Sequence, residues 1–211
     1  MRSLDVHLRA FGDEHVVYAL ALEEALSRPT RARVEIRSPS LLDLTPGLDE
    51  VGTLVFRAEG AEVRSDRLRL RAVSYEGEDD GIHRWALDYR ASFDFLRLVS
   101  DVRKFRDMTA DAIVADVLGR SGIAHVFELA SEVPARPNTI QYRETSFDFV
   151  SRLLEHEGIH YGVEDDVLVL SDRSSSAPRV SGRDRFDLSG SAGALAQDAV
   201  AISRLKRGSR I

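Results

Sequence analysis

The sequence predicts an α+β protein in which an antiparallel β-barrel or sandwich precedes a helix-containing part. Over roughly the first 95 residues, apolar and polar positions alternate in short runs separated by turn residues, which is the period of half-buried strands. After Phe93 the apolar positions recur at helical spacing, and two segments carry helix-capping residues. Strands followed by helices in this order favour the α+β class.

Composition excludes several classes of protein. With 211 residues, 43% of them hydrophobic, the chain can bury a core as one large domain or two small ones. A net charge of -6 gives no support to a general binder of nucleic acid or of anionic membranes. There is no cysteine, so the chain can form neither a disulfide framework nor a thiolate metal site. No apolar run approaches the roughly 20 residues that span a bilayer. We therefore predict no nucleic-acid partner and no membrane anchor.

The β region divides into alternating segments and turns. Residues 16–26 are ambiguous, because Ala, Leu and Glu favour a helix whereas Val and Tyr favour a strand. The acidic segment Glu76–Gly81 is expected to be the turn of a hairpin. Strands are expected at residues 4–8, 32–36, 53–58, 68–72 and 83–92.

Two later segments carry the signals of both helix ends. Thr109 and Thr145 supply an oxygen that can accept an unpaired amide of the first turn. Gly122 and Gly158 stand where a left-handed residue ends a helix at low cost. The spacing from threonine to glycine is the same in both, which we interpret as shared capping rather than an internal repeat. A further helical segment is expected at residues 93–101.

The second helix is expected to have one apolar face and a defined exit. Asp148 and Arg152 lie one turn apart and are expected to pair. Ile159, directly after the terminal glycine, is expected to pack back on Leu154. Residues 161–170 then alternate around an acidic turn, which predicts a hairpin.

The end of this helix also contains a motif typical of metal sites. His156, Glu157 and His160 match the HExxH pattern of zinc peptidases, in which both histidines lie one turn apart on a continuous helix. Gly158 is expected to stop the helix between them, so a helix end is the favoured interpretation and a zinc metallopeptidase a remote alternative. The chain has no dinucleotide-binding glycine motif, P-loop or nucleophile elbow. We assign no catalytic residue, metal or cofactor.

The segment QYRETSFDFVSRLLEHEGIHY, residues 141–161, resembles the hub domain of VgrG spike proteins of bacterial type VI secretion, which is similar to the hub of contractile phage tails. The shared pattern is Q-Y-x-E-T/S, a phenylalanine-rich capped helix, R-L-L-E, an acidic E-G-I and an aromatic strand. Residues 26–29 and 105–113 resemble other family segments. The matching residues, to which we assign a structural role, are Gln141, Tyr142, Glu144, Thr145, Phe149, Arg152, Leu153, Leu154, Glu155, Glu157, Gly158, Ile159 and Tyr161.

The resemblance implies a fold and a role. It implies a first small antiparallel β-barrel at residues 1–95, an α/β part with two capped helices and a hairpin at 96–172, and a linker with the start of a second barrel at 173–211. It also implies a homotrimer that caps a hexameric tube protein, meets baseplate proteins and carries a tip or effector protein, without catalysis. Such a protein starts in the bacterial cytoplasm and is exported by the injection apparatus. The alternative is a hub of a phage tail or extracellular injection system, which these residues do not separate from a type VI spike.

Overall fold

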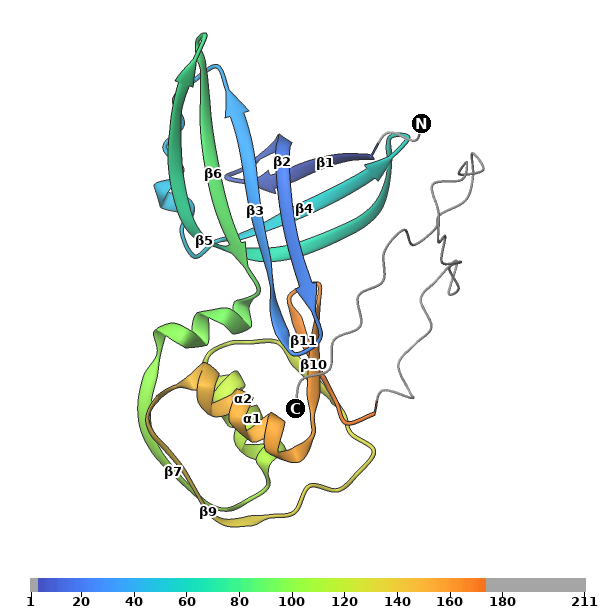
Figure 1. Cartoon of the computed structure of the whole chain (residues 1–211), viewed down its shortest axis with the longest axis vertical. Helices are drawn as coiled ribbons and strands as arrows, with labels where there is room; N and C mark the ends of the chain where they lie inside the picture. The colour runs from blue at the N-terminus through green and yellow to red at the C-terminus, as the bar shows by residue number, and fades with distance from the viewer. Residues whose placement is uncertain (1–3, 174–211) are drawn as a thin grey trace, which may run out of the picture. The chain divides into compact units, whose positions relative to one another are not determined.

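The computed structural model describes residues 4–173 (Figure 1). Its first half is an antiparallel sheet of six strands that closes on itself in the order β1-β2-β3-β6-β5-β4. Closure is achieved because β1 pairs with β2 along one edge and with β4 along the other. The strands are β1 (Leu4–Ala10), β2 (Asp13–Ala25), β3 (Arg28–Ser38), β4 (Val51–Ala58), β5 (Ala61–Asp79) and β6 (Ile82–Arg90).

The alternation of the sequence explains which side chains fill this barrel. In β3, Ala32, Val34 and Ile36 are fully buried, while the residues between them point outward. The single tryptophan, Trp85, and Tyr89 of β6 join the same core. The loop from β3 to β4 contains the short 3₁₀ helix η1 (Thr45–Gly47), which brings Leu44 into the core.

The structure settles one open assignment in the barrel and corrects one expectation. The ambiguous segment at residues 16–26 is the strand β2, since its pairing with β1 and β3 outweighs its helix-favouring alanines and glutamates. The acidic segment Glu76–Gly81 is mostly strand: β5 runs for 19 residues to Asp79, and only Asp80 and Gly81 form the turn. The barrel therefore has one long hairpin, β5-β6, in place of uniformly short strands.

The second half combines helices with two small sheets. A 3₁₀ helix, η2, leads out of the barrel, and the two α-helices pack against each other. The elements are η2 (Ser92–Leu98), β7 (Ser100–Met108), α1 (Ala110–Arg120), β8 (His125–Glu128), β9 (Arg136–Thr145), α2 (Ser146–Glu157), β10 (His160–Glu164) and β11 (Val167–Ser171). The structure is thus mostly β-sheet with a few helices, which agrees with the predicted α+β class.

The strands of the second half pair across long stretches of chain. β7 and β9 form a two-stranded antiparallel ribbon, although α1 and β8 lie between them in sequence. β10 and β11 form the predicted hairpin, and β11 also pairs with β8 in parallel. The helical prediction for residues 93–101 is wrong in part: Ser92–Leu98 is a 3₁₀ helix, and the chain is already extended at Ser100, where it pairs with β9.

Aromatic side chains form the centre of the second core. Phe105 of β7 stacks on Phe149 of α2, with ring centroids 5.7 Å apart and an interplanar angle of 13°. Phe93 of η2 meets Phe147 and Tyr161 at 4.9 and 5.0 Å. Because these rings come from β7, η2, α2 and β10, the cluster ties together elements that are distant in sequence.

Barrel and second half are joined by backbone and side-chain contacts. The amide of Ser27, in the β2-β3 turn, donates to the carbonyl of Tyr161 in β10 at 2.8 Å. Val163 of β10 packs against both apolar cores. The boundary expected near residue 95 stays a prediction, and the linker and second-barrel strand expected after residue 173 lie outside the described residues.

Candidate functional site

The segment that carries the family pattern, residues 141–161, begins with a complete helix cap. Thr145 is in extended conformation, and its Oγ1 accepts a hydrogen bond from the Asp148 amide at 3.0 Å. The same hydroxyl donates to the Asp148 carboxylate at 2.6 Å. This places a negative charge in the first turn, where it interacts favourably with the helix dipole. The cap predicted at Thr145 is confirmed.

The helix ends as the glycine predicts. Gly158 has φ of 70° and ψ of 20°, in the left-handed region, and the Ile159 amide donates to the Leu154 carbonyl at 2.9 Å. Ile159 is buried in the same core as Leu154. α1 stops in a similar way: Gly122 has φ of 66°, and the Ile123 amide donates to Leu118.

This ending decides the geometry of the HExxH motif. α2 stops at Glu157, and His160 already lies in β10, so the two histidines are not one turn apart on a continuous helix. Glu157 pairs with Arg136 of β9. Across residues 4–173, no group of three or more His, Asp or Glu side chains is placed to hold a metal ion.

Most of the matching residues build the core or the ends of α2. Phe149, Leu153, Leu154, Ile159 and Tyr161 are buried in the aromatic core. Gln141 is fully buried in β9, where its Nε2 donates to the Glu144 carbonyl and to Ser146 Oγ. Tyr142, by contrast, is 63% exposed, and Glu155 is exposed too. The pattern therefore describes a folded unit with one outward-facing aromatic residue.

The ion pairs of α2 differ from the expected one. Arg152 pairs with Glu144 of β9, Nη2 to Oε1 at 2.7 Å, and not with Asp148. Asp148 instead faces Arg97 of η2, with 4.0 Å between Nη1 and Oδ1. The helix is therefore held at its sides by charges from β9 and η2, which helical spacing alone does not indicate.

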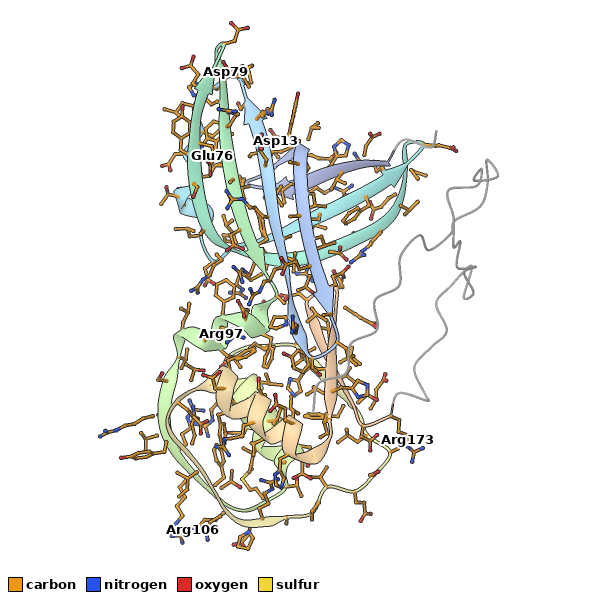
Figure 2. All side chains as sticks on the ribbon, viewed as in Figure 1. Asp13, Glu76, Asp79, Arg97, Arg106 and Arg173 are labelled. Carbon is orange, nitrogen blue, oxygen red and sulfur yellow. The ribbon has the colours of Figure 1, made fainter. Side chains whose placement is uncertain are left out.

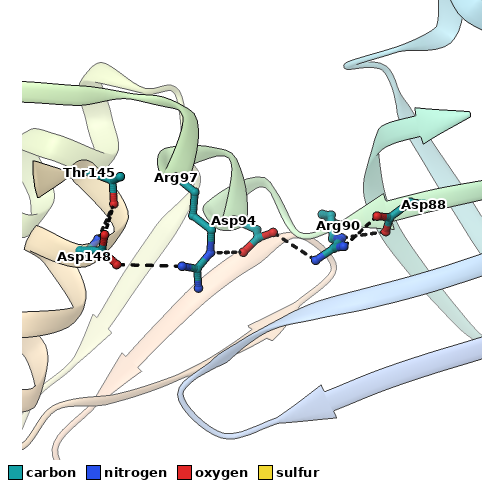
Figure 3. Close-up of polar contacts among 6 residues, drawn as sticks. All are labelled: Asp88, Arg90, Asp94, Arg97, Thr145 and Asp148. Atoms are coloured by element: carbon teal, nitrogen blue, oxygen red, sulfur yellow. Dashed lines mark hydrogen bonds and ion pairs between the residues drawn. The ribbon is translucent and has the colours of Figure 1, made fainter.

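A line of alternating charges runs from the barrel to the start of α2 (Figure 3). Arg90, at the end of β6, donates to both carboxylate oxygens of Asp88 at 2.7 Å and reaches Asp94 at 3.4 Å. Asp94, whose side chain is only 8% exposed, also accepts a hydrogen bond from Arg97 Nε at 2.7 Å. We call this the polar chain, and its members are Asp88, Arg90, Asp94, Arg97, Asp148 and Thr145.

Two arginines of the polar chain have further interactions. Hydrogen bonds from Arg90 to Asp88 raise the pKa of the Arg90 guanidinium above its ordinary value. Arg97 also lies over the ring of Phe147, with 3.4 Å from its central carbon to the ring centroid. Arg97 therefore links the polar chain to the aromatic core.

A contact between η2 and the β10-β11 turn was not predicted from the sequence. Asp166, in the β10-β11 turn, accepts hydrogen bonds from both the amide and the hydroxyl of Ser92, with 2.7 Å to the amide. These residues are 74 positions apart, and neither stands in a local pattern that predicts the contact. From the sequence alone, an acidic turn is expected to be solvated. In the structure, the Asp166 carboxylate instead caps the first amide of η2.

The pKa shifts near the site have structural causes. Burial raises the pKa of Tyr161 to about 12. The amides of Ala130 and Ser131 donate to Asp172, after β11, and lower the pKa of that carboxyl. Neither Tyr161 nor Asp172 lies in a catalytic set, that is, a nucleophile hydrogen-bonded to a base that a third group orients. The arrangement as a whole positions segments of chain relative to each other.

Comparison with known proteins agrees with this architecture. Residues 23–210 match the phage tail baseplate hub family, GPD. The chain belongs to that family. The type VI secretion system spike protein VgrG5 of Pseudomonas aeruginosa is 35% identical over 173 residues, which is 78% of this chain and 22% of that protein. The predicted resemblance to a VgrG-type hub is therefore confirmed.

Solved structures share the hub fold. The E. coli c3393 protein, described as a type VI secretion component with structural similarity to the T4 bacteriophage tail proteins gp27 and gp5, matches with a TM-score of 0.69 and 23% identity, over 82% of this chain and 50% of that one. A tail protein from Neisseria meningitidis MC58 matches with a TM-score of 0.64 and 19% identity, over 91% of this chain and 56% of that one.

The chain spans about a fifth of the length of the curated relatives VgrG5 and VgrG4b. What it shares with them is therefore the hub region. Within residues 4–173, no helix is long and apolar enough to cross a bilayer.

Proposed function

We propose that this chain is the hub of a trimeric contractile-injection spike, which caps the inner tube and carries a tip or effector protein. The observation that carries the proposal is the 35% identity to a type VI secretion spike protein over most of the chain. The role is mechanical and recognitional and requires no catalysis. The whole protein would be made in the bacterial cytoplasm and exported by the injection apparatus.

The internal contacts suit a part that transmits force. In the hub, the barrel and the α/β part are joined by the Ser27 to Tyr161 backbone bond, by the packing of Val163 against both cores and by the polar chain. These contacts lie on different elements, so no single one acts as a hinge for the whole connection. A rigid connection transmits force from the barrel to the rest of the spike when the barrel contacts a tube or baseplate protein.

Among hub proteins, the curated relatives favour a type VI spike over a phage-tail or extracellular injection hub. The chain is 29% identical over 165 residues to VgrG4b of Pseudomonas aeruginosa and 27% identical over 139 residues to VgrG3 of Vibrio cholerae, both named type VI spike proteins. The tail proteins among the solved structures are below 20% identical and support the fold alone.

Light scattering tests the assembly. A protein in which this hub is followed by the remaining hub and needle sequence of its VgrG relatives is expected to contain three copies at micromolar concentration. Co-purification with a hexameric tube protein of a type VI system is expected in addition. A clean monomer, or a trimer that does not bind the tube protein, would contradict the proposal.

A further inference from the structure

The outer face of the β7-β9 ribbon is both apolar and basic. The inner face, with Phe105, Thr139 and Gln141, is buried against the helices. On the outer face, Val102 lies opposite Tyr142, Lys104 opposite Ile140, and Arg106 opposite Asn138. Val102, Ile140 and Tyr142 are 59, 49 and 63% exposed.

A bulge brings a third cation to this face. Arg143 has a positive φ of 51° and stands where the β7-β9 register shifts. Its guanidinium lies over the ring of Tyr142, 5.4 Å from the centroid. In the part of the chain that the structure describes, Lys104, Arg106 and Arg143 form no ion pair with a carboxylate, so three cations border three exposed apolar side chains.

The tip of the β5-β6 hairpin, residues 75–82, has the opposite charge. Glu78, Asp79 and Asp80 are exposed and make no ion pair within residues 4–173. Ile82, opposite Asp79, is 38% exposed, and Tyr75, opposite Trp85 farther down the hairpin, is 50% exposed. The tip thus combines three carboxylates with two apolar side chains, a composition complementary to that of the ribbon.

One copy of the chain cannot bring these two surfaces together. β6 separates the tip from η2 and the ribbon, and its nine residues span roughly 30 Å at the rise of an extended strand. Asp79 and Arg106 accordingly lie at opposite ends in Figure 2. A contact between tip and ribbon therefore joins two copies through different surfaces, which is the type of contact that closes into a ring.

We propose that the β5-β6 tip of one copy docks on the outer face of the β7-β9 ribbon of a second copy. The proposal rests on the proposed function, since it names the surfaces through which hub copies meet in the spike. Glu78 and Asp79 approach Lys104 and Arg106, while Tyr75 and Ile82 cover the apolar side chains of the ribbon. Because the charges are at the rim and solvent-accessible, the contact weakens as salt is added.

Disulfide trapping tests the contact, because the chain has no cysteine of its own. Chains of residues 1–211 carrying Asp80→Cys are mixed with chains carrying Asn138→Cys, a position beside Lys104 and Arg106 whose substitution removes no charge. The mixture is expected to form at least tenfold more mixed disulfide dimer under mild oxidation than a control mixture of Asp80→Cys with Glu132→Cys, an exposed loop position. Equal yields in the two mixtures overturn the proposal.

Charge reversal separates docking from folding. Lys104→Glu with Arg106→Glu in the Asn138→Cys chain is expected to reduce trapping to the control level, and Glu78→Lys with Asp79→Lys in its partner is expected to restore it. Arg31→Glu with Arg67→Glu, which changes net charge equally on the barrel surface, is expected to leave trapping unchanged. Loss without restoration, or an equal effect of the barrel pair, overturns the proposal.

The outcome is distinguishable from failure of the proposed function. Light scattering of the extended spike reports whether three copies assemble, whichever surfaces they use. A trimer in which reversal of Lys104 and Arg106 has no effect leaves the hub function in place and refutes only these surfaces. A monomeric extended spike refutes the hub function itself.

Discussion

The barrel and the α/β part are built by different kinds of pairing. In the barrel, four of the six ladders join strands that follow each other directly: β1-β2, β2-β3, β4-β5 and β5-β6. In the α/β part, only β10-β11 is a hairpin, whereas β7-β9 and β8-β11 enclose helices. Local pairs form at a small loop-closure cost, but distant pairs require other contacts to hold the chain together.

The two cores differ accordingly. The barrel is a closed ring of backbone hydrogen bonds filled mainly by aliphatic side chains, so no strand depends on one neighbour alone. The α/β part relies on an aromatic cluster contributed by four elements. We therefore expect single truncations to be more damaging in the α/β part, and the following experiments test that difference from the largest effect to the smallest.

Truncation of Phe149 is expected to have the largest effect. The side chain is fully buried and stacks on Phe105, so Phe149→Ala removes the contact between α2 and β7 and should cost about 3–5 kcal/mol. Urea unfolding followed by circular dichroism measures the loss. The control is Tyr142→Ala, which removes an exposed aromatic side chain from β9 and should change stability by less than about 0.5 kcal/mol.

The barrel counterpart is Leu54→Ala, which empties a buried position in β4. If the two regions unfold as separate units, as the change in sequence pattern near residue 95 predicts, Phe149→Ala lowers only the transition of the α/β part and Leu54→Ala only that of the barrel. A common shift of one transition in both variants contradicts separate units. A smaller loss for Phe149→Ala than for Leu54→Ala contradicts the contrast between the cores.

Asp166→Ala tests the contact that fixes η2, the segment leading out of the barrel, against the β10-β11 turn. It leaves the amide of buried Ser92 without its acceptor and should destabilise the protein by about 2 kcal/mol. Asp166→Asn retains an acceptor and should cost less. Asp165→Ala is the matched control, since Asp165 also has positive φ and is exposed, so that it measures backbone strain alone. If thermal unfolding shows the same loss of stability for Asp165→Ala and Asp166→Ala, the hydrogen bonds to Ser92 contribute no stability and the prediction is wrong.

Gly158→Ala tests the end of α2 with a smaller expected loss of about 1 kcal/mol, the strain of a Cβ at positive φ. An added Cβ meets no atom within 4 Å, so steric overlap contributes nothing. His156→Ala, on the exposed last turn, should be nearly silent, and a chelator should not lower the melting temperature of either variant. Stoichiometric zinc that is lost on His156→Ala would reverse this interpretation of the HEGIH segment.

The smallest expected effect is a difference in pH response. In the barrel, hydrogen bonds from Arg57 and Arg9 lower the pKa of Glu14 from 4.5 to about 2, so its contribution to stability is present above pH 4.5 and is lost as the pH falls toward 2. In the α/β part, burial raises the pKa of Tyr161 from 10 to about 12, so its contribution is present below pH 10 and is lost as the pH rises toward 12.

Melting curves across both pH ranges check this assignment. Glu14→Gln should reduce the loss of stability at acid pH and leave the alkaline range unchanged. Tyr161→Phe should reduce the loss of stability at alkaline pH and leave the acid range unchanged. The acid effect should be small and salt-sensitive, because Glu14 is a surface group. An unchanged alkaline profile in Tyr161→Phe would show that another group is responsible.

What the sequence determined by itself is local. The caps at Thr109 and Thr145, the stops at Gly122 and Gly158, the β10-β11 hairpin and the alternation of β3 all depend on residues within a few positions of each other. Their side-chain chemistry and backbone preferences act at that range, so the sequence predicts them without knowledge of the fold. The family pattern at residues 141–161 is made of these same signals together with the buried face of α2.

The tertiary structure alone decided the features that join distant residues. Strand β2 was ambiguous because its residues suit either conformation, and only its ladders with β1 and β3 select the strand. Ser100–Met108 is a strand because β9 pairs with it from the far side of α1. Arg152 turns to Glu144, and Asp166 to Ser92, because a charge pairs with whichever opposite or polar group the fold brings within reach, and sequence distance carries no information about that.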